Sequence, residues 1–72
     1  MDQGTIIAER GTGTRLIQLV YETTIRGIDY GFMVDQLGRR SSVVPVDAAL
    51  AKGYWREPAT GQVAEAAATP KG

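Results

Sequence analysis

Cysteine and histidine are both missing from this chain of 72 residues. Without cysteine the chain can form no disulfide, and without histidine a zinc site would have to consist of carboxylates alone. The same absences exclude Ser-His and Cys-His catalytic pairs, and histidine as a general base. We therefore expect no metal site, no catalytic residue and no cofactor, and we expect that the protein is not an enzyme.

An excess of charge of either sign is also missing, because eight basic residues balance eight acidic ones. A protein that mainly grips a phosphate backbone normally carries a basic excess, so the composition counts against nucleic acid as the main partner. Arginine exceeds lysine, and alanine and glycine are frequent, which suggests a GC-rich bacterial or phage genome. Accessory proteins of phages, plasmids and mobile cassettes are often of this size.

Long apolar runs are absent as well. The longest one, residues 16–21, is interrupted by Gln18, so no segment is suited to span a membrane. Residues 1–3 lack the basic start of a signal peptide. We expect a cytoplasmic protein without a membrane contact.

The chain is long enough for one small domain at most. Residues 58–72 are rich in alanine, proline and glycine and contain no large apolar residue except Val63, so we predict that they form a disordered tail. Residues 1–57 then form the single domain. Domains of this size are marginally stable and usually need an additional source of stability, such as a disulfide, a metal site or oligomerisation. With disulfides and a zinc site excluded, we expect the chain to form a homo-oligomer.

The clearest pattern in the chain spans residues 28–38, where every second residue up to position 34 is apolar or aromatic. These residues are Ile28, Tyr30, Phe32 and Val34. Side chains two positions apart share one face of a strand, so the pattern predicts a β-strand with one apolar side and one mostly polar side. A turn at Gly38 follows it.

Residues 15–25 form a second predicted strand, because they are rich in the β-branched and aromatic types that suit a pleated surface. One face carries Ile17, Leu19, Tyr21, Thr23 and Ile25, and the other carries Leu16, Gln18, Val20, Glu22 and Thr24. Both faces are partly apolar at the start of the strand. We therefore expect this strand to be central in the sheet or to touch a partner subunit.

Shorter elements flank these two strands. Residues 4–9 have the composition of a strand, and residues 11–14 have that of a hairpin loop. Arg26 and Gly27 form a candidate tight turn between the two long strands.

A short helix is predicted after a strand that ends at Pro45, since proline cannot donate a hydrogen bond to a sheet. Asp47 stands where a helix N-cap is expected, ahead of residues 48–52, and Gly53 stands where the helix should stop. Residues 54–56 follow as a short extended segment.

Four or five strands joined by hairpin turns, with one short helix near the end, describe a mainly β protein. We predict either a small SH3-like barrel or an antiparallel meander of four to five strands. A strand that ends in proline, a single helical turn and a last short strand favour the barrel, because such barrels commonly close in this way. The rival is an open sheet of three or four strands that packs in a dimer.

Residues 30–50 resemble part of the plasmid-borne type II dihydrofolate reductases. Both have a tyrosine-led alternating strand, a glycine-containing turn, and a strand ending in Pro-Val before a helical turn with Ala-Ala-Leu, here residues 45–50. The resemblance implies a small SH3-like barrel that oligomerises, since that family assembles as tetramers around one pore. The family's active surface uses a Val-Gln-Ile-Tyr run before the proline, whereas this chain has Ser-Ser-Val-Val at residues 41–44. The resemblance therefore does not extend to reductase activity.

The best candidate for a binding surface is the segment Tyr54, Trp55 and Arg56, because tryptophan and arginine dominate interface hot spots. The alternative for Trp55, the only tryptophan, is that its ring closes the hydrophobic core. Arg39 and Arg40 precede two serines, a pattern found in phosphorylation sites and phosphate contacts. We include both arginines among the binding candidates.

Three classes of function remain open. The first is a small non-enzymatic binding module that regulates or inhibits an unidentified protein partner, with Trp55 exposed and no deep pocket. The second is a nucleic-acid-binding barrel, in which Arg39, Arg40, Trp55 and Arg56 stack on bases and contact phosphates. The third is a small-ligand or enzyme site at a subunit interface, because a chain this short can scarcely enclose a pocket of about 300 Å³ alone. We favour the first.

Overall fold

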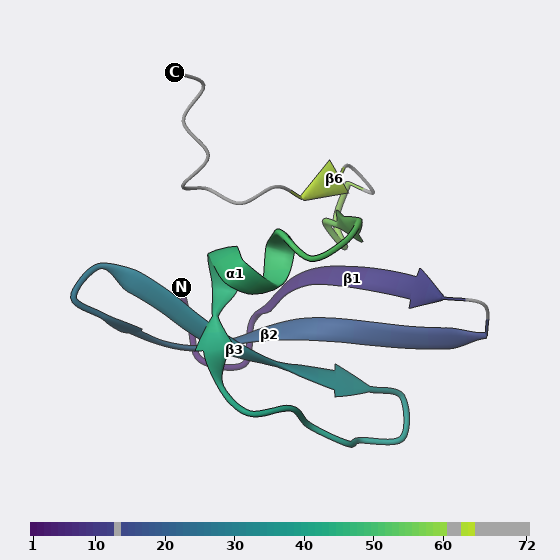
Figure 1. The fold of residues 1–72 in the computed structure, drawn as a ribbon, viewed down its shortest axis with the longest axis horizontal. Coiled ribbons are helices and arrows are strands. Elements are labelled where there is room, and N and C mark those ends of the chain that lie inside the picture. Colours follow the sequence, from purple (N-terminus) through teal and green to yellow (C-terminus); the bar gives the residue numbers. More distant parts are fainter. Residues whose placement is uncertain (13, 61–62, 65–72) are drawn as a thin grey trace.

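The computed structural model describes residues 1–12, 14–60 and 63–64. Its strands form one antiparallel sheet of six strands in the order β4-β3-β2-β1-β5-β6 (Figure 1). The elements in chain order are β1 (Ile6–Thr12), β2 (Arg15–Ile25), β3 (Ile28–Asp35), β4 (Val44–Pro45), α1 (Val46–Leu50), β5 (Trp55–Arg56) and β6 (Val63–Ala64). The predicted mainly β class, with a small antiparallel meander and one short helix, is confirmed.

The hairpin of β2 and β3 forms the centre of the sheet. Both strands begin where the alternation predicted, and the two residues between them, Arg26 and Gly27, have positive φ angles of 54° and 81°. Two successive residues with positive φ make a turn whose twist matches that of the flanking strands. The predicted tight turn is confirmed.

A bulge changes the face of the sheet on which the side chains lie in the second half of β2. The register with β3 shifts between Tyr21 and Thr23. The Tyr21 hydroxyl lies 2.5 Å from Oγ1 of Thr24, which donates in turn to Oδ1 of Asp29 at 2.6 Å. Because an extra residue in a strand reverses the alternation beyond it, Thr24 shares the side of Tyr21. The prediction that these two residues lie on opposite faces is wrong.

Helix α1 begins two residues earlier than predicted. Pro45, with an extended backbone, is the N-cap, and Asp47 lies in the first turn. A proline suits a helix start because its missing N–H would find no partner there, and a carboxylate in the first turn favours the helix dipole. The C-cap is Ala51 and not Gly53. Over the described ranges, no helical segment has the length and apolar character that a bilayer crossing requires.

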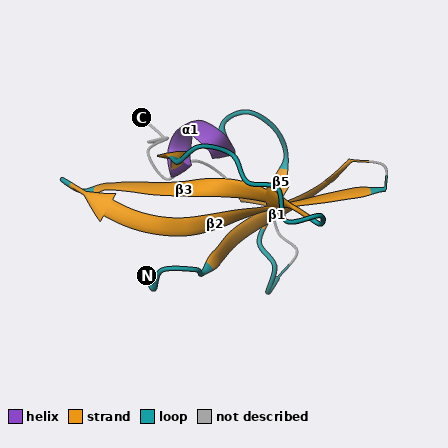
Figure 2. Ribbon diagram, turned by 90° about the horizontal axis from the view of Figure 1, so that it is seen from below, coloured by secondary structure: helices purple, strands orange, loops and turns teal. Residues whose placement is uncertain are grey.

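The chain between β4 and β5 carries α1 across one face of the sheet, since β4 lies at one edge and β5 lies beyond β1 (Figure 2). The core forms between α1 and this face, and Leu19 and Trp55 are fully buried there. The remaining members of the core cluster are Ala8, Val46, Ala49 and Leu50. Leu19 is paired with Ala8 and Met33 across the sheet, so these three residues face α1.

The predicted closed barrel does not form. Among the described strands, β4 and β6 end the sheet and do not pair with each other, so the sheet is open. The strand β6 lies within residues 58–72 and pairs with β5. Residues 61–62 and 65–72 of the predicted disordered tail lie outside the described residues, and the domain boundary at residue 57 stays a prediction.

Candidate binding groove beside α1

The structure buries Trp55 completely. Its indole N–H donates a 2.9 Å hydrogen bond to the carbonyl oxygen of Ala49, in the middle of α1. The prediction of an exposed Trp55 is wrong, and the core alternative is the correct one. The reason is the pairing of β5 with β1, which turns alternate side chains of β5 under the helix.

Tyr54 and Arg56, the neighbours of Trp55, are both exposed, Tyr54 to 84%. Successive residues of a strand point to opposite sides, so Arg56 faces away from α1. The three consecutive residues that were predicted to form one binding surface therefore do not share one.

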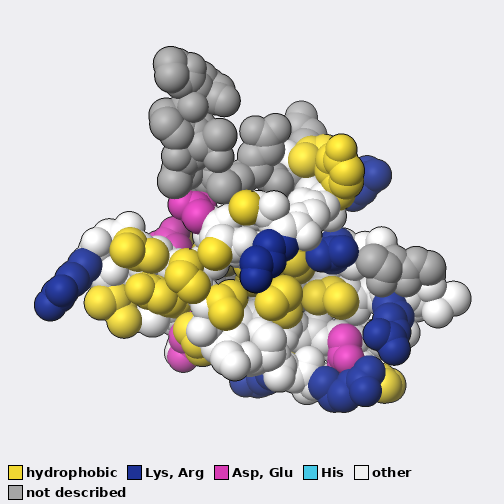
Figure 3. Space-filling view, viewed as in Figure 1, with side chains coloured by type: hydrophobic (Ala, Val, Ile, Leu, Met, Phe, Trp, Pro, Cys, Tyr) yellow, Lys and Arg dark blue, Asp and Glu magenta, His cyan; other side chains and the backbone are white. Residues whose placement is uncertain are grey.

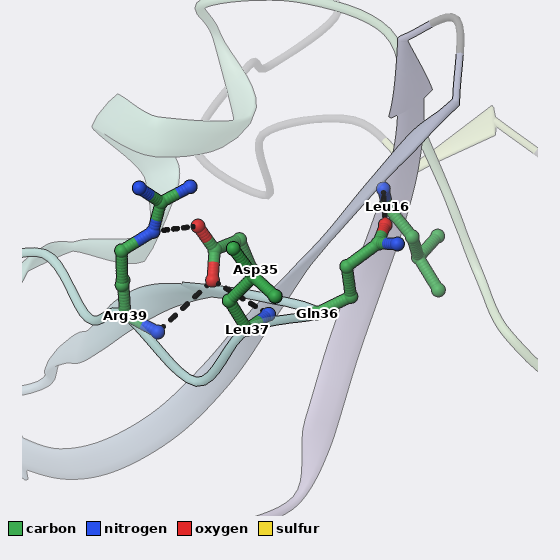
Figure 4. A network of polar contacts seen from close by, with 5 residues as sticks. All are labelled: Leu16, Asp35, Gln36, Leu37 and Arg39. Atoms are coloured by element: carbon green, nitrogen blue, oxygen red, sulfur yellow. Dashed lines mark hydrogen bonds and ion pairs between the residues drawn. The ribbon is translucent and has the colours of Figure 1, made fainter.

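Arg39 is held beside the end of β3 by Asp35 (Figure 4). Oδ1 of Asp35 accepts from the backbone N–H groups of Leu37 and Arg39 at 3.0 and 2.9 Å, and Oδ2 accepts from Nε of Arg39 at 2.7 Å. The Arg39 side chain is still 65% exposed, and Figure 4 shows its side chain joined to Asp35 only through Nε, with no contact drawn to the two terminal nitrogens. Asp35 uses one of the five N–H donors of this guanidinium, so the four on the terminal nitrogens remain available to a ligand.

The same contacts hold the pKa of the Asp35 carboxyl below its ordinary value of 3.8. The largest cause is the hydrogen bond from the backbone N–H of Arg39, partly opposed by desolvation. The Arg39 guanidinium and the N–H of Leu37 lower the pKa further. Hydrogen bonds to the charged form favour it, so Asp35 is an anion that orders this loop.

Arg40 lies on the side of the sheet away from α1. Its guanidinium carbon is 4.8 Å from the centre of the Phe32 ring, and its backbone forms a bridge with Val34. The ladder continues from Val34 through Gln18 and Glu9 to Arg56, a span of about 19 Å at the usual strand spacing. Arg40 and Arg56 thus share the side of the sheet away from α1 but lie far apart on it, and Trp55 is buried beneath α1, so the four predicted nucleic-acid contacts do not form one compact patch.

A groove of about 470 Å³ runs along the flank of α1. Its lining is apolar except for two cations, and consists of Arg10, Met33, Val44, Pro45, Ala48, Ala49, Lys52 and Trp55. Figure 3 shows a band of hydrophobic side chains on this face, with Lys and Arg side chains beside it. This groove is partly open to solvent, so the expectation that a chain this short can scarcely enclose a pocket of about 300 Å³ alone stays a prediction.

Arg10 enters this groove from β1. Its guanidinium carbon lies 5.5 Å from the centre of the Trp55 ring, which is a cation–π distance. Gly53 leaves room for the guanidinium, because a Cβ at that position would lie 2.9 Å from a terminal nitrogen of Arg10. Lys52, which is exposed in the turn that follows α1, supplies the second cation. Among the described residues neither cation has an ion-pair partner.

A smaller hollow of about 240 Å³ adjoins the groove, because Met33 lines both. It is lined also by Ile17, Val34, Asp35, Arg39 and Ser41. Ser41, part of the predicted phosphate-contact pattern, has a structural role: its hydroxyl accepts from the N–H of Met33 at 2.9 Å and donates to the carbonyl of Ser42 at 2.8 Å. The two hollows meet at Met33, and the smaller one carries both the carboxylate of Asp35 and the guanidinium of Arg39.

The sequence-based candidates missed Arg10, Met33 and Lys52 in this groove. The sequence contains one indication of the position of Arg10. It lies two positions after the small residue Ala8, so the two side chains share one face of the strand. Nothing local indicates that β5 would pair with β1 and bring Trp55 beneath Arg10. In the described part of the chain, no group of three or more carboxylates is arranged to hold a metal ion.

Comparison with protein-family models, with curated proteins and with solved structures finds no match to this chain.

Proposed function

We propose that this chain is a small, non-enzymatic binding module of the cytoplasm that regulates a larger protein by holding one of its segments in the groove beside α1. The segment is extended, apolar and acidic. The single observation that carries the proposal is the apolar groove of about 470 Å³ with two cations, Arg10 and Lys52, at its lining.

The chemistry of the groove selects the charge of the partner. No carboxylate lines the groove, and both cations lack an ion-pair partner among the described residues. A ligand carboxylate near Lys52 or Arg10 would gain a charge-assisted hydrogen bond beside a surface that excludes water. A basic segment would meet two like charges there, and such juxtaposition weakens binding.

The shape of the groove favours a protein segment over a compact small molecule. The groove beside α1 and the smaller hollow share Met33 as a lining residue, so an extended segment can place successive apolar side chains in both. Grooves that take apolar side chains with a polar rim are a recurring mode of peptide recognition. Arg39 lines the smaller hollow and Tyr54 lines neither, and we assign neither residue a central role.

The test uses two synthetic peptides with the isotope-labelled protein. In one acetylated and amidated ten-residue peptide, leucine and phenylalanine alternate with glutamate; in the other, lysine replaces glutamate. We expect the acidic peptide to shift the amide resonances of Arg10, Met33 and Ala48, and the basic peptide to leave them unchanged. Equal shifts with both peptides, or none with either, would contradict the proposal.

A charge reversal provides the matched control. Lys52→Glu should weaken binding of the acidic peptide about tenfold, which corresponds to about 1.4 kcal/mol. Arg26→Glu makes the same change of charge at the β2–β3 turn, outside the groove lining, and should leave the affinity within a factor of two. An equal loss of affinity in both variants would show that the peptide responds only to net charge, and it would contradict the groove as the binding site.

A further inference from the structure

A third hollow, of about 170 Å³, lies at the end of the sheet where β2 begins and β3 stops. Its lining is rich in hydrogen-bond donors and consists of Thr14, Arg15, Asp35, Gln36, Leu37 and Arg39. Asp35 and Arg39 also line the smaller hollow, which shares Met33 with the groove beside α1. An extended segment in the groove can therefore continue into this third hollow.

Arg15 brings the first guanidinium to the hollow. It lies two positions before Ile17 in β2, and Ile17 is the ladder partner of Asp35 in β3. Side chains two positions apart share one face of a strand, so Arg15 and Asp35 lie on the same side of the sheet. Arg15 is exposed, and over residues 1–12, 14–60 and 63–64 its side chain makes no hydrogen bond, ion pair or ring contact. Its five N–H donors are therefore available to a ligand.

Arg39 brings the second guanidinium, in a position that Asp35 fixes through Nε (Figure 4). The four N–H donors on its terminal nitrogens are not used by Asp35. Both oxygens of Asp35 already accept hydrogen bonds, Oδ1 from the backbone N–H groups of Leu37 and Arg39 and Oδ2 from the Arg39 side chain. Two guanidiniums and one carboxylate leave the lining with one net positive charge.

Gln36 adds neutral donors to the same lining. Its Oε1 accepts from the backbone N–H of Leu16 at 2.8 Å, which holds the side-chain amide between the end of β3 and the start of β2 (Figure 4). The amide nitrogen keeps two N–H groups that have no acceptor in the described part of the chain. A ligand that meets these donors has to be an anion with several acceptor oxygens.

We propose that this hollow binds the phosphate of a phosphorylated side chain, carried by the segment that the groove beside α1 holds. The inference rests on the proposed function and extends it to the chemistry of the partner. A phosphate monoester carries a charge of about −1.5 to −2 at pH 7 and three strong acceptor oxygens, and guanidinium groups bind phosphate through paired hydrogen bonds. A carboxylate has one charge and two oxygens, and so matches two guanidiniums less well.

A phosphorylated protein segment fits this surface better than a nucleic acid does. A nucleic acid carries a phosphate at every nucleotide and needs cations along its whole path. Here the hollow with Arg15 and Arg39 leads to a groove whose lining is apolar except for two cations. Trp55, on which a base could have stacked, is fully buried.

The test uses the acidic ten-residue peptide described above, extended at one end by phosphoserine or by serine. A second pair carries the extension at the other end, because an extended segment can run in either direction. In one of the pairs, we expect calorimetry to show the phosphopeptide binding about tenfold more tightly than the serine peptide, through the new charge-assisted hydrogen bonds. The same phosphopeptide should shift the side-chain Nε–H resonances of Arg15 and Arg39.

Arg15→Gln should remove most of this gain and leave the chain folded, as circular dichroism would show. The affinity of the serine peptide should change little, since Arg15 does not line the groove. Arg15→Lys should lose part of the gain, because an ammonium group keeps the charge but cannot form the paired hydrogen bonds of a guanidinium. Arg26→Gln removes the same charge at the β2–β3 turn, outside the hollow, and should keep the gain.

The two kinds of peptide separate this inference from the proposed function. If the serine peptides bind and phosphoserine adds nothing in either pair, the phosphate site is overturned and the groove is not. If no peptide binds, the groove is contradicted, and the inference with it. A gain that survives Arg15→Gln, or that Arg26→Gln removes equally, would also overturn the site. So would a ten-nucleotide oligothymidylate that binds as tightly as the phosphopeptide and depends equally on Arg15.

Discussion

Trp55 connects three parts of the molecule through one side chain. Its N–H reaches the carbonyl of Ala49 in α1, its ring lies against the core residues of the sheet, and the Arg10 guanidinium lies over the ring. A tryptophan supplies both the apolar surface and the donor that such a position needs. The residue proposed from sequence as a contact for partners instead shapes the groove from below.

Replacing Trp55 with phenylalanine should destabilise the fold by about 2 to 3 kcal/mol. The change removes the donor to a buried carbonyl and leaves a small cavity. Urea unfolding followed by circular dichroism measures the loss. Tyr54→Phe, at a position 84% exposed, is the control and should change the free energy of unfolding by less than about 0.5 kcal/mol. A similar loss for both variants would contradict the burial of Trp55.

Asp35 should make the stability of the protein depend on pH below neutrality. Its pKa is lower in the folded state, so the unfolded chain binds the proton more tightly and the stabilisation is present above about 3.8. It is lost as the pH falls through the folded pKa. Asp35→Asn should therefore lower the urea midpoint at pH 7, and the difference from the unchanged chain should shrink at acidic pH.

The matched control for this pH series is Asp2→Asn. Asp2 is exposed, and its side chain makes no hydrogen bond within the described residues. Its replacement should leave the urea midpoint unchanged at every pH. An Asp35→Asn chain with a constant deficit from pH 7 down to pH 2 would show that the effect of Asp35 is not electrostatic.

At the scale of elements, β2 and β3 approach each other closely at Gly31, next to the bulge. A Cβ at Gly31 would collide with the carbonyl oxygen of Val20 and lie 3.2 Å from its carbonyl carbon. On its other side it would lie 3.5 Å from a methyl group of Val46 in α1. Glycine at this position therefore lets the helix and two strands meet without a gap.

Gly31→Ala should destabilise the fold by about 1 to 3 kcal/mol, because backbone atoms cannot move aside as a flexible side chain can. The fluorescence of buried Trp55 reports unfolding in urea. Gly11→Ala is the comparison within the same sheet: its nearest atom would be 3.7 Å away, an ordinary contact. We expect that change to stay within about 0.5 kcal/mol. An equal effect of the two alanines would mean that the close approach at Gly31 does not matter.

At the scale of the whole molecule, the connection through α1 joins the last part of the chain to the first. Glu9 in β1 pairs with Arg56 in β5, so the sheet is complete only after the helix has crossed it. The groove, which needs β1, α1 and β5 together, therefore exists only in the folded chain.

Ending the chain after Glu57 should leave the fold intact, with a loss below about 1 kcal/mol. The described strand β6 has two residues, and Val63 is 52% exposed, so little apolar surface is lost with it. Ending the chain at Gly53 also removes Trp55 and should abolish cooperative thermal unfolding. Circular dichroism during heating distinguishes the two chains. Loss of cooperative unfolding in the longer one would place residues 58–72 in the domain.

Local pattern in the sequence was enough to predict the β class, the long strand from Arg15 to Ile25, the start of the next at Ile28, and the turn at Arg26 and Gly27. Strand alternation and turn chemistry depend on residues only a few positions apart, so the local sequence is enough to predict these elements. The absence of cysteine and histidine likewise excluded disulfides and Ser-His or Cys-His catalytic pairs directly from the sequence.

Only the tertiary structure decided the burial of Trp55, the place of Arg10 in a groove, and the side on which Thr24 lies. The first two depend on pairing between strands some forty residues apart, after α1 has crossed the sheet. The third depends on a bulge, which a one-residue change of register creates between strands. Contacts between distant segments are chosen by the packing of the whole core, and no local pattern records them.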